Sequence, residues 1–211
     1  MGCVVRSIML LPIRKPCHFD NSFFIIMFDR CFVVIPTFNE EERISQVVRS
    51  LLEVGLGNII VVDDGSSDRT VERARVEGAL VVVHCLNRGQ GAALQTGTDM
   101  ARNLGADTVV HFDGDGQFNP QDIKPAIERL VGGAYDIVLG SRFLDDRSAS
   151  IPWFKRTIMF PCARIINRFF TGLMLTDVHN GFRVLGKRAL NEVIIVHDRM
   201  AHNSDIVAQI K

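Results

Sequence analysis

The sequence of 211 residues contains no CxxC pair and no long uninterrupted hydrophobic run, and its formal net charge is +0. Its five cysteines are scattered, which argues against a zinc site or a disulfide framework and favours a reduced, intracellular setting. A membrane-spanning helix needs about 18 or more apolar residues, and the most apolar window, 23–36, is interrupted by Asp29 and Arg30. We therefore expect no transmembrane helix within the chain. The balanced charge also predicts no nucleic-acid partner.

The chain length fits one domain, or one domain with an appendage. Residues 1–30 show neither a helical nor a strand period, and we expect them to be a disordered or non-native extension. Residues 31–211 are expected to form the folded domain. A helical pattern that starts near Asn203 is still running at Lys211, so we expect a truncated C-terminus and a membrane-anchoring segment or partner outside this sequence.

Short apolar segments alternate with amphipathic helical patterns, which predicts βαβ units and a parallel sheet. The segments expected to be strands are 31–35, 58–62, 79–83, 108–112 and 136–139. Asn39 and the three glutamates after it are expected to begin a helix. Ligands of parallel sheets bind beyond the carboxyl ends of the strands. The polar segments 36–39, 63–68 and 113–117 each follow a strand, so we expect them to face one crevice.

Asp113 and Asp115 stand where a strand ends, with Gln117 next in the same row. Alternate residues of an extended backbone point the same way, so both carboxylates can face one site. Such oxygen ligands suit Mg²⁺ or Mn²⁺ shared with a substrate diphosphate, and the alternative is a solvated turn. An EF-hand is excluded because its glycine and glutamate positions hold Phe118 and Lys124.

Residues 151–175 carry basic and aromatic side chains but no acidic residue, which is typical of a helix lying in a membrane interface. The alternative is a core-packed helix with a solvated basic face. His179 lies close to Asp177 and is a candidate for contacting substrate. Four other histidines lack metal-ligand spacing and are expected to be structural or on the surface: His84, His111, His197 and His202.

Four ordered motifs, at 33–40, 62–68, 87–93 and 113–117, resemble family 2 glycosyltransferases of the GT-A fold. Residues 140–142 and 177–183 are similar to the polyprenyl-phosphate branch, the dolichyl-phosphate mannosyl- and glucosyltransferases. The resemblance implies an α/β, Rossmann-like fold with a mostly parallel sheet and helices on both faces. It also implies that 31–211 is the catalytic domain.

The resemblance assigns roles residue by residue. Those implied to bind the nucleotide are Pro36, Thr37, Asn39, Glu40, Asp64, Gln90, Asp113 and Gly114. Asp113, Asp115 and Gln117 would hold Mg²⁺ or Mn²⁺, and Arg142, Arg156 and Arg183 would meet the acceptor phosphate. The implied catalytic residues are Asp115, Asp177 and Arg142. Many relatives have lysine where Gln90 stands, so this chain departs from the family at a position facing phosphate.

The implied activity is inverting, metal-dependent sugar transfer from a UDP- or GDP-sugar to a polyprenyl or dolichyl phosphate. The implied location is peripheral, on the cytoplasmic face of a membrane. Three alternatives stay open. The first is a saccharide or other hydroxyl acceptor, for which Asp177 or Asp205 would serve as the base. The other two are a nucleotidyltransferase and an inactive nucleotide-sugar-binding module. A phosphate acceptor needs no general base because it is already ionised at neutral pH.

Overall fold

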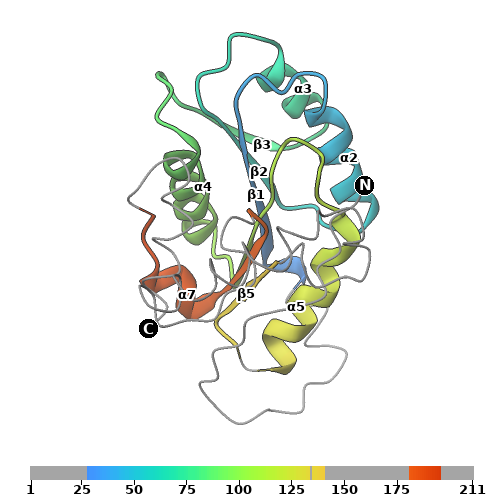
Figure 1. Ribbon diagram of the computed structural model, residues 1–211, viewed down its shortest axis with the longest axis vertical. Helices are drawn as coiled ribbons and strands as arrows, with labels where there is room; N and C mark the ends of the chain where they lie inside the picture. The colour runs from blue at the N-terminus through green and yellow to red at the C-terminus, as the bar shows by residue number, and fades with distance from the viewer. Residues whose placement is uncertain (1–27, 134, 141–180, 196–211) are drawn as a thin grey trace, which may run out of the picture.

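Six strands form one sheet in the computed structural model of the chain, which describes residues 28–133, 135–140 and 181–195 (Figure 1). The first half contains β1 (Cys31–Thr37), α2 (Ile44–Glu53), β2 (Ile59–Asp63), α3 (Thr70–Val76), β3 (Leu80–Val83) and α4 (Gln90–Asn103). The second half contains β4 (Thr108–His111), the 3₁₀ turn η1 (Pro120–Asp122), α5 (Ile123–Gly132), β5 (Ile137–Leu139), β6 (Arg183–Gly186) and α7 (Lys187–Glu192). The expected strands are all present, with ends shifted by one residue or two.

The strands lie in the order β3-β2-β1-β4-β6-β5. β1 pairs in parallel with β2 and β4, and β2 pairs in parallel with β3. β6 lies between β4 and β5 and is antiparallel to both. The expectation of a mostly parallel α/β sheet is therefore confirmed. The alternation of segments did not predict β6, because βαβ units join parallel strands and β6 is antiparallel to both of its neighbours.

Two apolar clusters cover the two faces of the sheet, and the helices divide between them. One cluster contains buried side chains of α2, α3 and α5, and the other contains those of α4 and α7. Figure 1 shows α4 and α7 on one side of the strands and the other three helices on the opposite side. Within the described ranges, no helix combines the length and the apolar character needed to cross a membrane.

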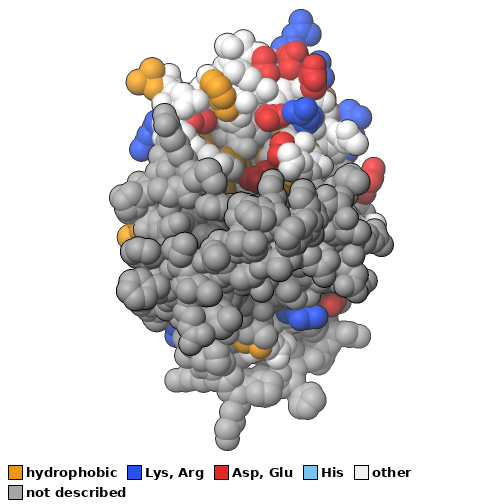
Figure 2. Space-filling view, in the orientation of Figure 1, with side chains coloured by type: hydrophobic (Ala, Val, Ile, Leu, Met, Phe, Trp, Pro, Cys, Tyr) orange, Lys and Arg blue, Asp and Glu red, His pale blue; other side chains and the backbone are white. Residues whose placement is uncertain are grey.

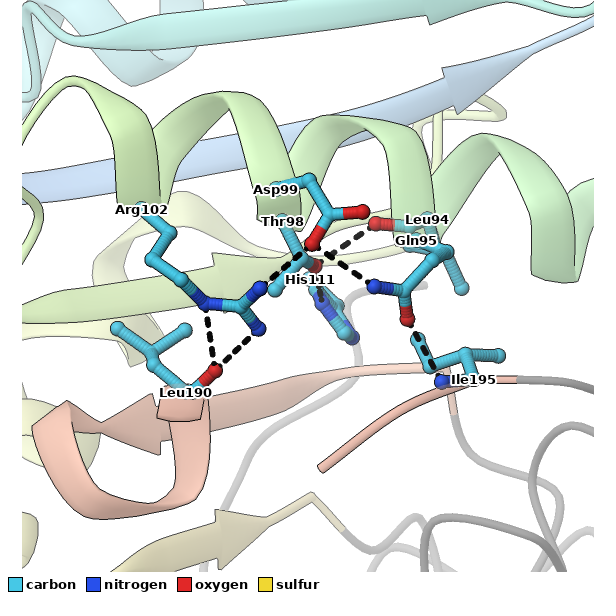
Figure 3. Close-up of polar contacts among 8 residues, drawn as sticks. All are labelled: Leu94, Gln95, Thr98, Asp99, Arg102, His111, Leu190 and Ile195. Atoms are coloured by element: carbon cyan, nitrogen blue, oxygen red, sulfur yellow. Dashed lines mark hydrogen bonds and ion pairs between the residues drawn. The ribbon is translucent and has the colours of Figure 1, made fainter. Parts of the chain in front are cut away.

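A row of polar side chains along α4 holds the end of the described chain (Figure 3). The Ile195 N–H donates to Oε1 of Gln95 over 2.6 Å, and Nε of Arg102 donates to the Leu190 carbonyl over 2.9 Å. Nη2 of Arg102 donates to the same carbonyl. Oδ1 of Asp99 accepts from both Gln95 and Arg102, at 2.9 and 2.7 Å. The row therefore fastens α7 and the residues after it to α4.

The expected helix start at Asn39 is wrong. Helix α2 begins at Ile44, and no side chain caps it. Asn39 instead has a φ of 55°, in the left-handed region that asparagine tolerates better than most residues. The N–H of Ile44 bonds to the carbonyl of Glu40, which opens the first turn. The side chain of Asn39 is used elsewhere, in contacts between two loops.

Candidate active site

A pocket of about 450 Å³ opens among the loops that follow β1, β2 and β4 and the start of α4. Its lining residues are Pro36, Thr37, Phe38, Glu40, Asp64, Asn87, Gly89, Gln90, Ala93, Asp113, Gly114 and Asp115. Acidic side chains lie toward the upper end of the described surface in Figure 2, at the end of the sheet that holds these loops. The expectation that the three polar segments share one crevice is confirmed.

The loops after β1 and β2 are tied together by side chains of each. The Asn39 N–H donates to Oγ of Ser66 over 2.8 Å, and the Ser67 N–H donates to Oδ1 of Asn39 over 2.9 Å. The Glu41 N–H donates to Oδ2 of Asp68 over 3.1 Å. These reciprocal bonds continue the pairing of β1 and β2 into the two loops and fix them against each other.

Asp68 also stabilises the start of α3. Its Oδ1 accepts from the backbone N–H of Thr70 at 2.9 Å and from the Thr70 hydroxyl at 2.5 Å. Burial raises the pKa of this carboxyl, but the hydrogen bonds from Thr70 and Glu41 outweigh it and hold the pKa below its usual value. Arg69 is the N-cap of α3 and its side chain makes no capping bond, so Asp68 orders the turn that leads into the helix.

Asp64 is almost fully buried at the back of the pocket, with 4% of its surface exposed. Its Oδ1 lies 2.7 Å from Nδ1 of His84 and accepts from the Arg88 N–H at 2.9 Å. Its Oδ2 accepts from the Gly89 N–H at 2.6 Å. The carboxylate therefore shapes the loop that leads from β3 into α4. Hydrogen bonds from backbone N–H groups to a carboxylate are shorter and stronger than those between neutral groups.

His84 is the residue of this site that the sequence did not single out for function. It is 8% exposed, and its Nε2 lies 2.9 Å from Oγ1 of Thr96 in α4. The expectation of a structural role is compatible with this placement, but the ring also supports Asp64 directly. No local sequence pattern indicated this role, because the partners Asp64 and Thr96 lie 20 and 12 positions away along the chain. His111, the second buried histidine, contacts Oγ1 of Thr98 at 3.0 Å, away from the pocket lining.

Asp113 and Asp115 both line the pocket, on the loop that follows β4. Nε2 of Gln90, at the start of α4, donates to Oδ1 of Asp113 over 2.9 Å. Oδ1 of Asp115 accepts from the Gln117 N–H over 2.9 Å. The Gln117 side chain is exposed and does not belong to the pocket lining.

The donor set of this wall fits a hard divalent cation. Two carboxylates of one loop face the same space, and Mg²⁺ is commonly held by one or two carboxylates together with substrate phosphates and water. The described part of the chain contains no cluster of three or more His, Cys, Asp or Glu side chains that could hold a metal. A cation here would therefore take its remaining ligands from a bound diphosphate and from water.

Most residues expected to bind a nucleotide line this pocket. The exception is Asn39, which lies outside the lining and joins two loops. Arg183, expected at the acceptor phosphate, lies in β6 with 1% of its surface exposed. Several expectations concern residues outside the described ranges: Arg142, Arg156, Asp177, His179, His197, His202, Asp205 and the segments 1–27 and 151–175.

Comparisons with known proteins place the chain among glycosyltransferases. The chain is 36% identical over 182 residues to an uncharacterized protein of Methanocaldococcus jannaschii, covering 85% of this chain and 74% of that protein. It is 32% identical over 177 residues to the UDP-N-acetylglucosamine–dolichyl-phosphate N-acetylglucosaminyltransferase of Methanococcus voltae, covering 75% and 70% of the two chains.

A solved structure shares the fold. It is glucosyl-3-phosphoglycerate synthase of Mycobacterium tuberculosis, in complex with Mn²⁺, UDP and glucosyl-3-phosphoglycerate, with a TM-score of 0.64 and 19% identity. The match covers 95% of this chain and 71% of that one. The model of the family described as "Glycosyl transferase family 2" matches residues 32–194. The chain therefore belongs to glycosyl transferase family 2, as its four motifs predicted.

Proposed function

We propose that this glycosyltransferase moves a sugar from a UDP- or GDP-sugar to a polyprenyl or dolichyl phosphate, with Mg²⁺ or Mn²⁺ held by Asp113 and Asp115. The observation that carries the proposal is the meeting of these carboxylates with Pro36, Glu40 and Asp64 in one pocket of about 450 Å³. Pockets of this size hold ligands as large as a nucleotide sugar.

The division of the pocket wall supports an orientation for the donor. Residues 36–38, Glu40 and Asp64 form the part built from the first two loops, and we assign the base and ribose to it. Asp113 and Asp115 form the part built from the third loop, and we assign the diphosphate to it. A cation bound there would neutralise the negative charge that develops on the leaving diphosphate.

A phosphate acceptor removes the need for a general base in the protein. A phosphate monoester is largely ionised at neutral pH, so the attacking oxygen needs orientation and no proton acceptor. Arginines supply such orientation through paired N–H donors, and we assign this role to Arg142 and Arg156. Asp177 would line the reaction site. Direct attack on the sugar gives single displacement with inversion, through a centre that becomes oxocarbenium-like.

Names of relatives support the lipid phosphate as acceptor. The Methanococcus voltae relative is named for transfer to dolichyl phosphate. Another relative, 31% identical over 173 residues, is the polyprenol monophosphomannose synthase of Mycolicibacterium smegmatis. We therefore propose that the enzyme works at a membrane surface, on its cytoplasmic side, as a peripheral protein.

The donor half of the proposal is tested by calorimetric titration of the full chain with UDP- and GDP-sugars, with and without Mn²⁺. We expect one nucleotide sugar to bind about tenfold or more tightly when the cation is present, a difference of roughly 1.4 kcal/mol. Asp115→Asn should abolish the gain in nucleotide-sugar affinity that the cation causes. Glu53→Gln, which alters an exposed carboxylate at the end of α2, should leave that gain unchanged. Equal affinity with and without the cation would contradict the proposal.

The acceptor half is tested by comparing transfer to dolichyl phosphate with transfer to dolichol, which presents a hydroxyl. We expect product only from the phosphate. Flotation with phosphatidylcholine vesicles that contain polyprenyl phosphate should carry the wild type upward and leave more of Arg156→Ala behind. Equal transfer to both lipids would favour the hydroxyl-acceptor alternative.

A further inference from the structure

Arg183 is one of the largest fully buried side chains among the described residues, although it carries a charge. It lies in β6, opposite His111 of β4 and Leu139 of β5. Its guanidinium is shielded from solvent, which is not the setting expected for a side chain that meets a phosphate arriving from solvent. Its position therefore calls for a role other than the acceptor contact that the family resemblance implies.

The strand register places this arginine beside Asp113. β4 and β6 pair antiparallel, with Thr108 opposite Gly186 and His111 opposite Arg183. Two residues further along, the same register sets Gly181 opposite Asp113. A Cβ atom on Gly181 would overlap Oδ2 of Asp113 and lie 2.9 Å from its Oδ1. The Asp113 carboxylate thus occupies the space that a side chain at position 181 would need.

Charge agrees with this placement. Burial lowers the pKa of Arg183 to about 10, and the negative charge of Asp113 acts in the opposite direction. The guanidinium therefore stays charged at neutral pH, and a buried charge is costly unless an opposite charge is near. Gln90 adds a neutral contact from α4, donating to Oδ1 of Asp113 over 2.9 Å.

We propose that Arg183 is a positioning residue for Asp113, with Gly181 and Gln90 completing the same support, and that it does not contact the acceptor phosphate. The proposal rests on the metal-dependent function proposed above, because its consequence is the alignment of one of the two carboxylates assigned to the cation. Groups that orient a ligating carboxylate commonly change metal affinity by about 10- to 100-fold when they are removed.

The test compares full-length Arg183→Met and Arg183→Lys with wild type. Free Mn²⁺ is measured by electron paramagnetic resonance in the presence of UDP, and UDP affinity is measured by calorimetry without metal. We expect Arg183→Met to weaken Mn²⁺ binding by about 10- to 100-fold and Arg183→Lys to restore part of it, with metal-free UDP affinity unchanged. Arg188→Met, which alters an exposed arginine of α7, is the control and should bind Mn²⁺ normally.

A second variant covers the case in which a change at Arg183 unfolds the protein. Gly181→Ala keeps every charge but forces the Asp113 carboxylate to move, and it should weaken Mn²⁺ binding in the same direction. Gly132→Ala, whose added Cβ meets nothing within 4 Å, is its control.

The outcomes separate this proposal from the proposed function. Normal Mn²⁺ binding by folded Arg183→Met and Gly181→Ala would overturn the positioning role. So would an unchanged Mn²⁺ affinity together with a raised KM for dolichyl phosphate, which would return Arg183 to the acceptor. If the wild type itself shows no Mn²⁺-dependent UDP binding, the metal-dependent function fails and the positioning role fails with it.

Discussion

Nδ1 of His84 lies 2.7 Å from Oδ1 of Asp64, and both side chains are buried. An ionised carboxylate can only accept, so the imidazole donates from Nδ1 and turns its other nitrogen toward Thr96. Asp64 in turn holds the Arg88 and Gly89 N–H groups at the pocket. The ring therefore links α4 to the loop that lines the proposed nucleotide site.

This chain of contacts predicts the effect of changing His84. His84→Ala should weaken UDP binding by about tenfold. A hydrogen bond to a charged group contributes roughly 1.5–3 kcal/mol, but Asp64 keeps its two backbone donors, so the expected loss is at the lower end of this range. His84→Asn, which can place an amide N–H near the position of Nδ1, should recover much of the affinity. Calorimetry with UDP measures both.

Thr96→Val is the matched control for His84, because it removes only the outer hydrogen bond of the ring. It should cost less affinity than His84→Ala. If His84→Ala binds UDP as tightly as wild type while remaining folded, Asp64 does not depend on the ring for its orientation.

A second prediction concerns the packing of α4 on the sheet at Gly97. A Cβ atom there would overlap Cγ1 of Val34 and lie 3.0 Å from Cγ2 of Val62, so the helix sits against β1 and β2 at this residue. Gly97→Ala should lower the free energy of unfolding by about 1–3 kcal/mol. The energetic cost of the steric overlap is larger than the stabilisation that alanine gives a helix relative to glycine. Urea unfolding provides the measurement.

Gly132→Ala provides the comparison for Gly97. It lies in the last turn of α5, where an added Cβ meets nothing within 4 Å. The substitution should leave stability unchanged or raise it slightly. A Gly97→Ala protein as stable as Gly132→Ala would show that α4 can shift without cost.

The sequence predicted the strands and the shared crevice because both depend on local pattern and a general rule of topology. Continuous apolar runs such as 59–62 indicate strands covered on both faces, and parallel strands bring their carboxyl ends together. The convergence of Asp64 and Asp113 on one pocket followed from these two facts.

The missed features all depend on partners far along the chain. Asn39 has the sequence character of a helix cap, but Ser67, 28 positions away, donates to its side chain instead. In the sequence, Arg183 resembles a phosphate ligand in a polar turn. In the structure it lies in β6, between β4 and β5. Neither the contact between Asn39 and Ser67 nor the position of β6 in the sheet produces a periodic pattern in the sequence. Local patterns therefore could not predict either feature.

A third prediction uses the row of side chains on α4 shown in Figure 3. Gln95→Leu removes the acceptor of the Ile195 N–H, so this amide should exchange with solvent faster. The Val193 N–H, which donates to the carbonyl of Ala189, should exchange at its wild-type rate. Hydrogen exchange followed by NMR compares the two amides in one sample. Equal acceleration at both would mean that the whole of α7 loosens, and no acceleration would mean that another group protects Ile195.

The fourth prediction concerns pH and the buried thiol of Cys31, whose pKa burial raises from 9.0 to about 12. An acid with a raised folded pKa stabilises the fold fully below its unfolded pKa and loses that contribution as pH rises toward the folded value. The free energy of unfolding should therefore fall by roughly 1.4 kcal/mol per pH unit above about pH 9 on account of this thiol.

Cys31→Val keeps an apolar side chain in β1 and removes the ionisation. Because all other titrating groups are common to both proteins, the difference between their urea unfolding curves should grow steadily from about pH 9 to about pH 10.5. Parallel pH profiles would show that Cys31 ionises in the native protein as readily as in the unfolded chain.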